Sequence, residues 1–205
     1  MKVCIIDIGM GNLTSVKNAF DCLGCLTSII RTPGELQSAD RIILPGVGAF
    51  GDAMDHLNAG GWILALNEEI ITHKKPFFGI CLGMQVLAER GNEHGSHKGL
   101  GWIRGEVERL QGSVNHRIPH IGWDDVEFQS NHKMYTGMGT TRDFYFVHSY
   151  VLHLAELDIV SGICDYNGRF PASIQAGNIW ATQYHPEKSQ KAGLQVLKNF
   201  ITSGA

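Results

Sequence analysis

The chain has 205 residues, of which 43% are apolar and 18% charged, and its formal net charge is −3. A compact chain of this size buries roughly 70% of its unfolded surface, so one domain with its own core is expected. The slightly acidic charge balance, without a basic run, argues against nucleic acid as a partner. No apolar stretch approaches the roughly 20 residues of a membrane helix, and MKVCIIDIG is too short for a signal-peptide apolar region, so a cytoplasmic location is expected.

The first half of the chain alternates between strand and helix patterns. The expected strands are 3–6, 27–30, 41–46 and 77–80, and the expected helices are 13–23, 53–57 and 62–71, with another helix starting soon after Cys81. This alternation indicates a parallel sheet with helices on both faces. Because ligands bind such sheets beyond the carboxyl ends of the strands, the segments 7–9 and 45–48 and Cys81 should share one rim.

The second half consists of short β-type runs separated by Gly, Pro or Asn. These runs are GEVERL, GWDDVEF, FYFVHSYV, DIVSGICDY, PASIQAG and IWATQYHP. We expect antiparallel strands that continue the same sheet, and then a closing helix over 189–201 with Ser189 as its N-cap. The polar, glycine-rich segment 89–101 is expected to be a mobile loop. The prediction is a single α/β domain over residues 1–205, with an open, mostly parallel sheet flanked by helices.

The five cysteines occur at scattered spacings, which favours reduced thiols over a disulfide framework. Cys22 and Cys25 have the C-x-x-C spacing of redox proteins. However, Gly24 between them resembles a helix C-cap, whereas a redox pair is expected to open a helix. We therefore expect a structural role for this pair.

Cys81 lies in the sharp turn between a buried strand and a helix, with Gly79 and Gly83 on either side. Free amides and the helix dipole at such a point favour a thiolate, and the glycines allow the strand–nucleophile–helix turn known as an elbow. Taken alone, this stretch is equally compatible with a small buried hydrophobic cysteine, which is the commoner case.

A base for Cys81 is available in the segment QYHPEKS. His185 directly follows a strand, and Glu187, two residues later, can orient the imidazole as in nucleophile–base–acid triads. The alternative is that His-Pro-Glu only begins the last helix, with Pro186 near its first position. Both interpretations can hold together.

The loop PGVGAFGD follows a strand and can turn backbone amides toward an anion. A tetrahedral intermediate on Cys81 would need such donors, and the amides of Val47 and Leu82 are the candidates. The alternative is an ordinary tight turn. The loop lacks the Lys-Ser/Thr of a phosphate-binding P-loop.

In this order and spacing, GICLGMQ, PGVG and QYHPEKS resemble class I glutamine amidotransferases, whose fold is flavodoxin-like. The resemblance implies that Cys81 is the nucleophile, His185 the base and Glu187 its orienting acid. DIGMGNLTSVKNAF, PGVGAFGDAM, HIGWDDV and YFVHSYV further resemble the glutaminase subunits of imidazole glycerol phosphate synthase, over nearly the whole chain. Relatives in anthranilate or GMP synthesis usually have a second proline in the oxyanion loop and a histidine after the elbow glycine, where this chain has Val47 and Met84.

The resemblance also implies further site residues. Gly48, Gln85 and Glu93 correspond to positions that contact glutamine, and the backbone of His148, Ser149 and Tyr150 to the part that holds its carboxylate end. Trp123, Tyr145 and Lys188 correspond to positions that face a partner protein. Tyr145 and Trp123 could equally be packing residues of strands. The position of Met10 in Gly-Met-Gly on the expected rim suggests an interface role, but the sequence does not define its purpose.

The implied partner is a (β/α)8-barrel cyclase, which receives ammonia and converts PRFAR to imidazole glycerol phosphate and AICAR. No cofactor is expected. A metal at Glu93, His94 and His97 is disfavoured because the spacing suits zinc poorly and no fourth ligand is present. The alternatives that remain are a paralogous glutaminase for a barrel synthase of nucleotide-sugar or amidine synthesis, a non-catalytic thiol-sensing module, and a cysteine peptidase.

Overall fold

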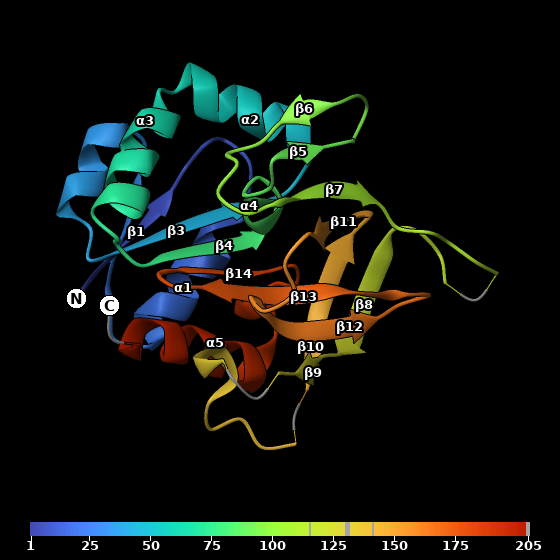
Figure 1. Ribbon diagram of the computed structural model, residues 1–205. Coiled ribbons are helices and arrows are strands. Elements are labelled where there is room, and N and C mark those ends of the chain that lie inside the picture. Colours follow the sequence, from blue (N-terminus) through green and yellow to red (C-terminus); the bar gives the residue numbers. More distant parts are fainter. Residues whose placement is uncertain (115, 130–131, 141, 204–205) are drawn as a thin grey trace.

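The computed structural model describes residues 1–114, 116–129, 132–140 and 142–203. Its main feature is an eight-stranded sheet in the order β2-β1-β3-β4-β14-β13-β12-β9 (Figure 1). The strands are β1 (Lys2–Ile6), β2 (Leu26–Ile30), β3 (Arg41–Gly46), β4 (Phe77–Cys81), β9 (Glu127–Phe128), β12 (Val160–Asp165), β13 (Arg169–Ala176) and β14 (Ile179–Thr182). β1 to β4 and β14 pair in parallel, and β13, β12 and β9 extend the sheet antiparallel. The predicted α/β class is confirmed.

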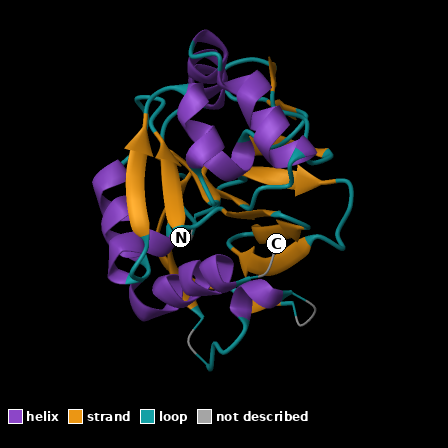
Figure 2. Ribbon diagram, turned by 90° about the vertical axis from the view of Figure 1, so that its left-hand side faces the viewer, coloured by secondary structure: helices purple, strands orange, loops and turns teal. Residues whose placement is uncertain are grey.

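Helices cover both faces of this sheet, as Figures 1 and 2 show. The helical segments are α1 (Leu13–Cys22), α2 (Phe50–Ala59), α3 (Trp62–Leu66), α4 (Leu82–Gln85) and α5 (Gln190–Thr202), the π-helix η2 (Asn67–Thr72), and the short 3-10 turns η1 (Pro33–Ser38), η3 (Lys133–Tyr135) and η4 (Pro186–Lys188). α1 and α5 pack on one face around Phe20, Phe78 and Phe200. α2 and α3 pack on the other face around Phe50 and Trp62.

The second half differs from the expected continuous sheet. Among the described residues, β9, β12 and β13 continue the main sheet antiparallel, whereas β14, expected with them, pairs in parallel with β4. β8 (His120–Asp125) and β10 (Asp143–His148) form a separate two-stranded ribbon, and β11 (Tyr150–Leu154) joins β7 (Gly105–Arg109), β5 (Arg90–Gly91) and β6 (His97–Lys98) in a four-stranded sheet. The run 144–151, expected as one strand, is thus divided at Ser149. Its residues pair with β8 on one side of this break and with β7 on the other.

Three further segments differ from their predictions. The 89–101 segment contains β5 and β6, because β5 pairs in parallel with β7 and β6 pairs antiparallel with β5. The helix after Cys81 ends at Gln85, and the apolar residues beyond it pack in the core as turns. Ser189 occupies the N-cap position of α5, but its hydroxyl makes no cap bond. That hydroxyl instead donates to the His185 carbonyl at 2.7 Å.

The part of the chain that the structure describes holds no helix with the length and apolarity needed to cross a bilayer. All five cysteines, including Cys22 and Cys25, are free thiols. The C-x-x-C pair lies at the end of α1, and Gly24 follows there with a φ of +78°, as a C-terminal helix glycine does.

The elbow that carries Cys81 depends on two glycines at a close backbone crossing. A Cβ on Gly79 would lie 2.5 Å from the Gly83 carbonyl oxygen, and a Cβ on Gly83 would lie 1.8 Å from the Leu44 carbonyl oxygen in β3. Both distances are shorter than any real carbon–oxygen contact. The chain can therefore return past β3 and β4 only with glycine at these two positions.

We expect Gly83→Ala to lower the free energy of unfolding by about 3 kcal/mol or more, because an added methyl group there must displace the backbone of β3. Urea unfolding followed by circular dichroism measures this change. Gly34→Ala is the matched control, since a Cβ at Gly34 meets nothing within 4 Å. The two substitutions lowering stability equally would contradict the packing argument.

Candidate active site

Cys81 ends β4 and immediately precedes α4, at the carboxyl edge of the parallel sheet. Its backbone has φ +54° and ψ −106°, a conformation that a non-glycine residue adopts only when its surroundings enforce it. The side chain is 5% exposed. Such strain at a thiol is typical of a nucleophile held in position rather than of a cysteine that only fills space.

His185 and Glu187 lie at the end of β14, the strand next to β4. His185 Nδ1 and Glu187 Oε1 are 2.8 Å apart, and both side chains are almost completely buried. Among the described residues, His185 Nε2 has no hydrogen-bond partner. Burial alone would lower the pKa of His185, but the Cys81 thiol and the Glu187 carboxylate together raise that pKa to about 10. The arrangement therefore favours a charged imidazolium close to the thiol.

The backbone around His185 is held by the β10 strand. The His185 amide donates to the Tyr145 carbonyl at 2.9 Å, and the Tyr145 amide donates to the Ser189 hydroxyl at 3.0 Å. Pro186 occupies the first position of the 3-10 turn η4, which is separate from the last helix, so His-Pro-Glu does not itself begin α5 as the alternative interpretation held. The same segment thus begins a helical turn and presents the imidazole beside Cys81.

The expected oxyanion donors lie on both sides of the nucleophile. Gly46, which ends β3, pairs in register with Cys81, and Val47 follows it with 42% of its surface exposed. Gly48 has a φ of +115°, and a Cβ there would lie 2.7 Å from the Met10 methyl carbon. Leu82 is the first residue of α4. The loop from β3 and the start of α4 therefore flank the sulfur, and the anion-binding role of these amides remains a prediction.

Two buried glutamines connect Cys81 with the strand β11. Gln85 Nε2 donates to the Tyr150 carbonyl at 2.8 Å and to Gln183 Oε1 at 3.1 Å. Gln183 Nε2 in turn donates to Cys81 Sγ at 3.6 Å. The sequence predicted a role for Gln85 but not for Gln183, although Gln183 stands two residues before His185 in QYHPEKS. An amide donor stabilises a thiolate, so Gln183 belongs to the candidate site.

The remaining residues expected at the glutamine site are placed as follows. His148 ends β10, Ser149 forms the break, and Tyr150 begins β11, so their backbone adjoins the Cys81 edge. The sulfur itself lies 4.0 Å from the Val147 carbonyl oxygen. Glu93 accepts a hydrogen bond from the Phe50 amide at 2.8 Å, at the start of α2. In this structure Glu93 therefore stabilises the end of a helix, and its contact with a substrate amine remains a prediction.

The residues expected at a partner face lie together. Trp123 and Tyr145 are cross-strand neighbours in the β8–β10 ribbon, with ring centroids 6.0 Å apart. Lys188 Nζ lies 5.6 Å from the centroid of the Tyr145 ring. Trp123 is 48% exposed and Ile121 on the same strand is 60% exposed. An open aromatic and apolar surface next to the site is typical of a protein interface.

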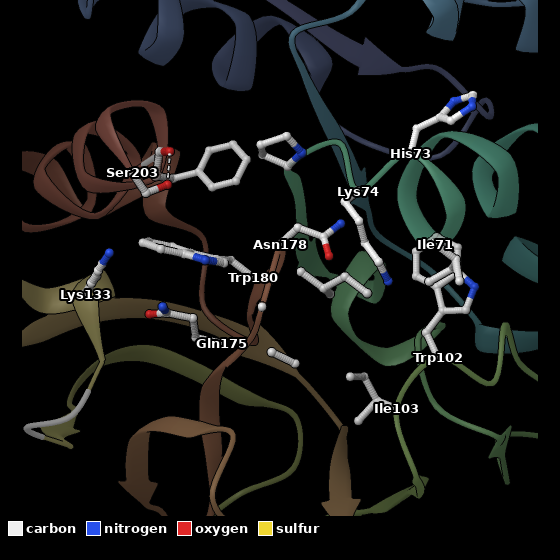
Figure 3. A pocket seen from close by; sticks show the side chains of 15 residues that line it. Ile71, His73, Lys74, Trp102, Ile103, Lys133, Gln175, Asn178, Trp180 and Ser203 are labelled. Carbon is white, nitrogen blue, oxygen red and sulfur yellow. Dashed lines mark hydrogen bonds between the residues drawn. The ribbon is translucent and has the colours of Figure 1, made fainter. Parts of the chain in front are cut away.

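A cavity of about 850 Å³ lies elsewhere, near the starts of β4 and β14, where Figure 3 shows Trp102, Trp180 and Lys74 around it. Cys81 is at the other end of β4, so this cavity is not part of the site. Among the residues that the structure describes, no group of three or more His, Cys, Asp or Glu side chains is suited to a metal ion.

The model of the family Glutamine amidotransferase class-I matches residues 4–203, and the chain belongs to this family. The solved structures show the same fold: PurLQS from Thermotoga maritima superposes with a TM-score of 0.75 at 18% identity, over 98% of this chain and 97% of that one. A crystal structure described as a glutamine amidotransferase also gives a TM-score of 0.75, at 20% identity, over 97% of this chain and 96% of that one.

Sequence relatives define the branch of the family. Imidazole glycerol phosphate synthase subunit HisH 1 of Campylobacter jejuni is 46% identical over 97% of this chain and 98% of its own length. Subunit HisH of Moorella thermoacetica is 44% identical over 97% of this chain and 93% of its own length. The imidazole glycerol phosphate synthase hisHF of Arabidopsis thaliana is 43% identical over 97% of this chain, which covers 34% of that protein. Within the amidotransferases, the chain groups with the HisH subunits.

We expect Glu187→Gln to lower the pKa of His185 from its raised value, because the imidazolium loses the carboxylate that stabilises it. NMR titration of the histidine ring measures this pKa, and alkylation of Cys81 by iodoacetamide at neutral pH should slow by about tenfold or more as the thiolate loses its counter-ion.

Glu127→Gln is the matched control for this substitution. Glu127 also pairs with a cation, Arg169, at 2.7 Å, but its side chain is 57% exposed and far from the site. Equal alkylation rates in the two variants would contradict the ion-pair interpretation of Cys81 and His185.

Proposed function

We propose that this chain is the glutaminase subunit of an imidazole glycerol phosphate synthase, with Cys81 as nucleophile, His185 as base and Glu187 as the orienting acid. The observation that carries the proposal is the buried His185–Glu187 pair, 2.8 Å apart, beside a strained thiol at a sheet edge. The identity to HisH subunits over nearly the whole chain supports the choice of pathway.

The proposed reaction is hydrolysis of the glutamine side-chain amide in two steps. The Cys81 thiolate attacks the carboxamide carbon, and His185 gives its proton to the leaving nitrogen, so that ammonia departs and a thioester remains. Water, deprotonated by His185, then attacks the thioester and releases glutamate and the thiolate. The amides of Val47 and Leu82 would stabilise the oxyanion, since they flank the sulfur.

The proposed glutamine pocket adjoins the break between β10 and β11. Gly48 and Gln85 would contact the substrate, the backbone of His148, Ser149 and Tyr150 would hold its carboxylate end, and Glu93 would meet its amine. The buried Gln85 and Gln183 amides support a site for a small amide rather than for a polypeptide chain.

The proposed partner is a (β/α)8-barrel cyclase bound as a heterodimer over Trp123, Tyr145 and Lys188. The relative named hisHF supports this partner, because this chain matches only 34% of that protein and the rest can supply a second enzyme part. Ammonia would pass directly to the barrel, where PRFAR is converted to imidazole glycerol phosphate and AICAR. The free thiols of all five cysteines are consistent with the proposed cytoplasmic location.

Glutamate release from glutamine tests this function directly. It is measured for the chain alone, with the purified cyclase and a PRFAR analogue, and with Cys81→Ala in the same mixture. Strong stimulation by the cyclase that Cys81→Ala abolishes supports the proposal. Hydrolysis through Cys81 that ignores the cyclase would assign the chain to another synthase, such as the paralogous barrel enzymes. No hydrolysis under any condition would favour a non-catalytic module.

We expect Trp123→Ala to weaken binding of the cyclase by about 10- to 100-fold, because exposed tryptophans at the centre of an interface contribute strongly to affinity. Isothermal titration calorimetry measures the dissociation constant. Leu64→Ala provides the control, since Leu64 is 83% exposed but lies on α3, away from the β8–β10 ribbon. If both variants bind like the unsubstituted chain, the proposed interface is wrong.

A further inference from the structure

Two buried histidines of the β8–β10 ribbon form a series of close polar contacts, with a carboxylate at one end and a backbone carbonyl at the other. Asp124 Oδ2 lies 3.4 Å from His120 Nε2, and His120 Nδ1 lies 3.2 Å from His148 Nε2. His148 Nδ1 lies 3.1 Å from the Tyr150 carbonyl oxygen. His120 and His148 are 2% and 6% exposed, and they pair directly across the two strands.

This series continues to the nucleophile through side chains already described. The Tyr150 carbonyl that accepts from His148 also accepts from Gln85 Nε2. Gln85 bonds to Gln183, and Gln183 donates to the Cys81 sulfur. The direction in which the Tyr150 carbonyl points therefore fixes both glutamine amides against the thiol.

The two ends of the series compete for protons. The Tyr150 carbonyl and the Asp124 carboxylate both accept only, so the full set of three contacts needs three N–H protons. Two neutral imidazoles supply only two. A neutral pair can therefore donate to Tyr150 and leave a lone pair of His120 against Asp124, or donate to Asp124 and release the Tyr150 carbonyl. Donating at both ends is a third arrangement, but it sets the lone pairs of His120 Nδ1 and His148 Nε2 against each other at 3.2 Å. A third proton satisfies both ends and gives the pair one positive charge opposite Asp124.

The surroundings of the pair favour the neutral state in neutral solution. Burial lowers the pKa of His148 to about 3, with a further lowering from the nearby charges of His120 and His185. Burial also lowers the pKa of His120. Asp124 raises this pKa, and His116 lowers it further. The other groups packed against His120 are the rings of Phe146, Tyr166 and Phe170, of which only Tyr166 titrates. The competition between Tyr150 and Asp124 is thus present under ordinary conditions.

We propose that His120 is a positioning residue of the glutamine site, which acts through His148 to hold the Tyr150 carbonyl, and with it Gln85 and Gln183, against Cys81. Asp124 opposes this positioning, because it favours the arrangement in which the neutral pair donates to Asp124 rather than to the Tyr150 carbonyl. The inference rests on the proposed function, because it concerns the geometry of the glutaminase pocket. It gives a role to two histidines that touch neither the thiol nor its base by a hydrogen bond in this structure.

The test is glutamine affinity, measured by calorimetry in a Cys81→Ser background with the cyclase present, at about pH 6 and about pH 8. Without a further substitution, the affinity should change little between the two pH values, because burial lowers the pKa of both histidines and the pair does not take up the third proton in this range. Asp124→Asn should bind glutamine several-fold more tightly at both pH values, since an asparagine amide can donate to His120 Nε2, which leaves one imidazole proton for the Tyr150 carbonyl and one for the contact between the two histidines.

Substitution of His120 tests the same inference from the other side. His120→Phe keeps an aromatic ring between Phe146 and Tyr166. It should nevertheless weaken glutamine binding by about tenfold at both pH values, because His148 loses its partner and no longer fixes the Tyr150 carbonyl. His120→Asn retains a donor toward His148 and should restore most of the affinity. Tyr166→Phe is the matched control: it keeps the ring stacked 3.9 Å from His120 and removes only a hydrogen bond to the Arg117 carbonyl.

Three results would overturn the inference. One is His120→Phe with unchanged affinity, and another is Asp124→Asn with the same affinity as the unsubstituted chain. The third is equal weakening by His120→Phe, His120→Asn and Tyr166→Phe, which would indicate packing alone. If His120→Phe fails to fold, Asp124→Asn and His120→Asn still decide the matter. Absence of glutamine binding in the unsubstituted complex would instead remove the proposed function itself and the inference with it.

Discussion

The close crossing of α4 over β3 is the constraint on which the rest of the site depends. Gly83 lies so close to the Leu44 carbonyl that no side chain fits between the two backbones. This proximity turns the chain sharply enough to leave Cys81 in a left-handed conformation at the end of β4. The strain is maintained because buried apolar side chains on both faces of the sheet hold β3 and β4 in place. Packing of the hydrophobic core thus fixes the direction of the Cys81 side chain.

The base and its acid are positioned in a different way from Cys81. His185 and Glu187 follow β14, and their position is set by hydrogen bonds from the backbone of Tyr145 in the β8–β10 ribbon. The base is therefore attached both to the main sheet and to the ribbon that carries Trp123. Electrostatics completes the arrangement, because a buried imidazole next to a carboxylate and a thiol is most stable with a positive charge. The main sheet therefore supplies both partners of the proposed thiolate–imidazolium pair, and the ribbon holds the imidazolium in place.

The sequence was most informative where local patterns alone determine the structure. Apolar runs such as 77–80 are buried on both faces, so they identified the parallel strands, and Gly79 and Gly83 identified the elbow. The pairing of the later strands was not predictable, because the alternation of apolar residues along a strand does not determine which other strand it pairs with. The break at Ser149 and the contact between His120 and His148 both follow from register across strands. Gln183 was missed because a glutamine just after a strand carries no local sign of its partner.

Ser203, the last residue that the structure describes, lies far from the site, and this has a consequence for any enzyme joined behind α5. Arg41, the first residue of β3, donates to the carbonyl of Ser203, whereas Gly46 at the other end of the same strand adjoins Cys81. A six-residue strand spans about 20 Å, at roughly 3.3 Å per residue. A second enzyme joined behind α5 and seated on the proposed interface of the ribbon would therefore require a connecting segment that returns along the whole length of the sheet. At least about six extended residues must serve as a tether before the second enzyme can begin.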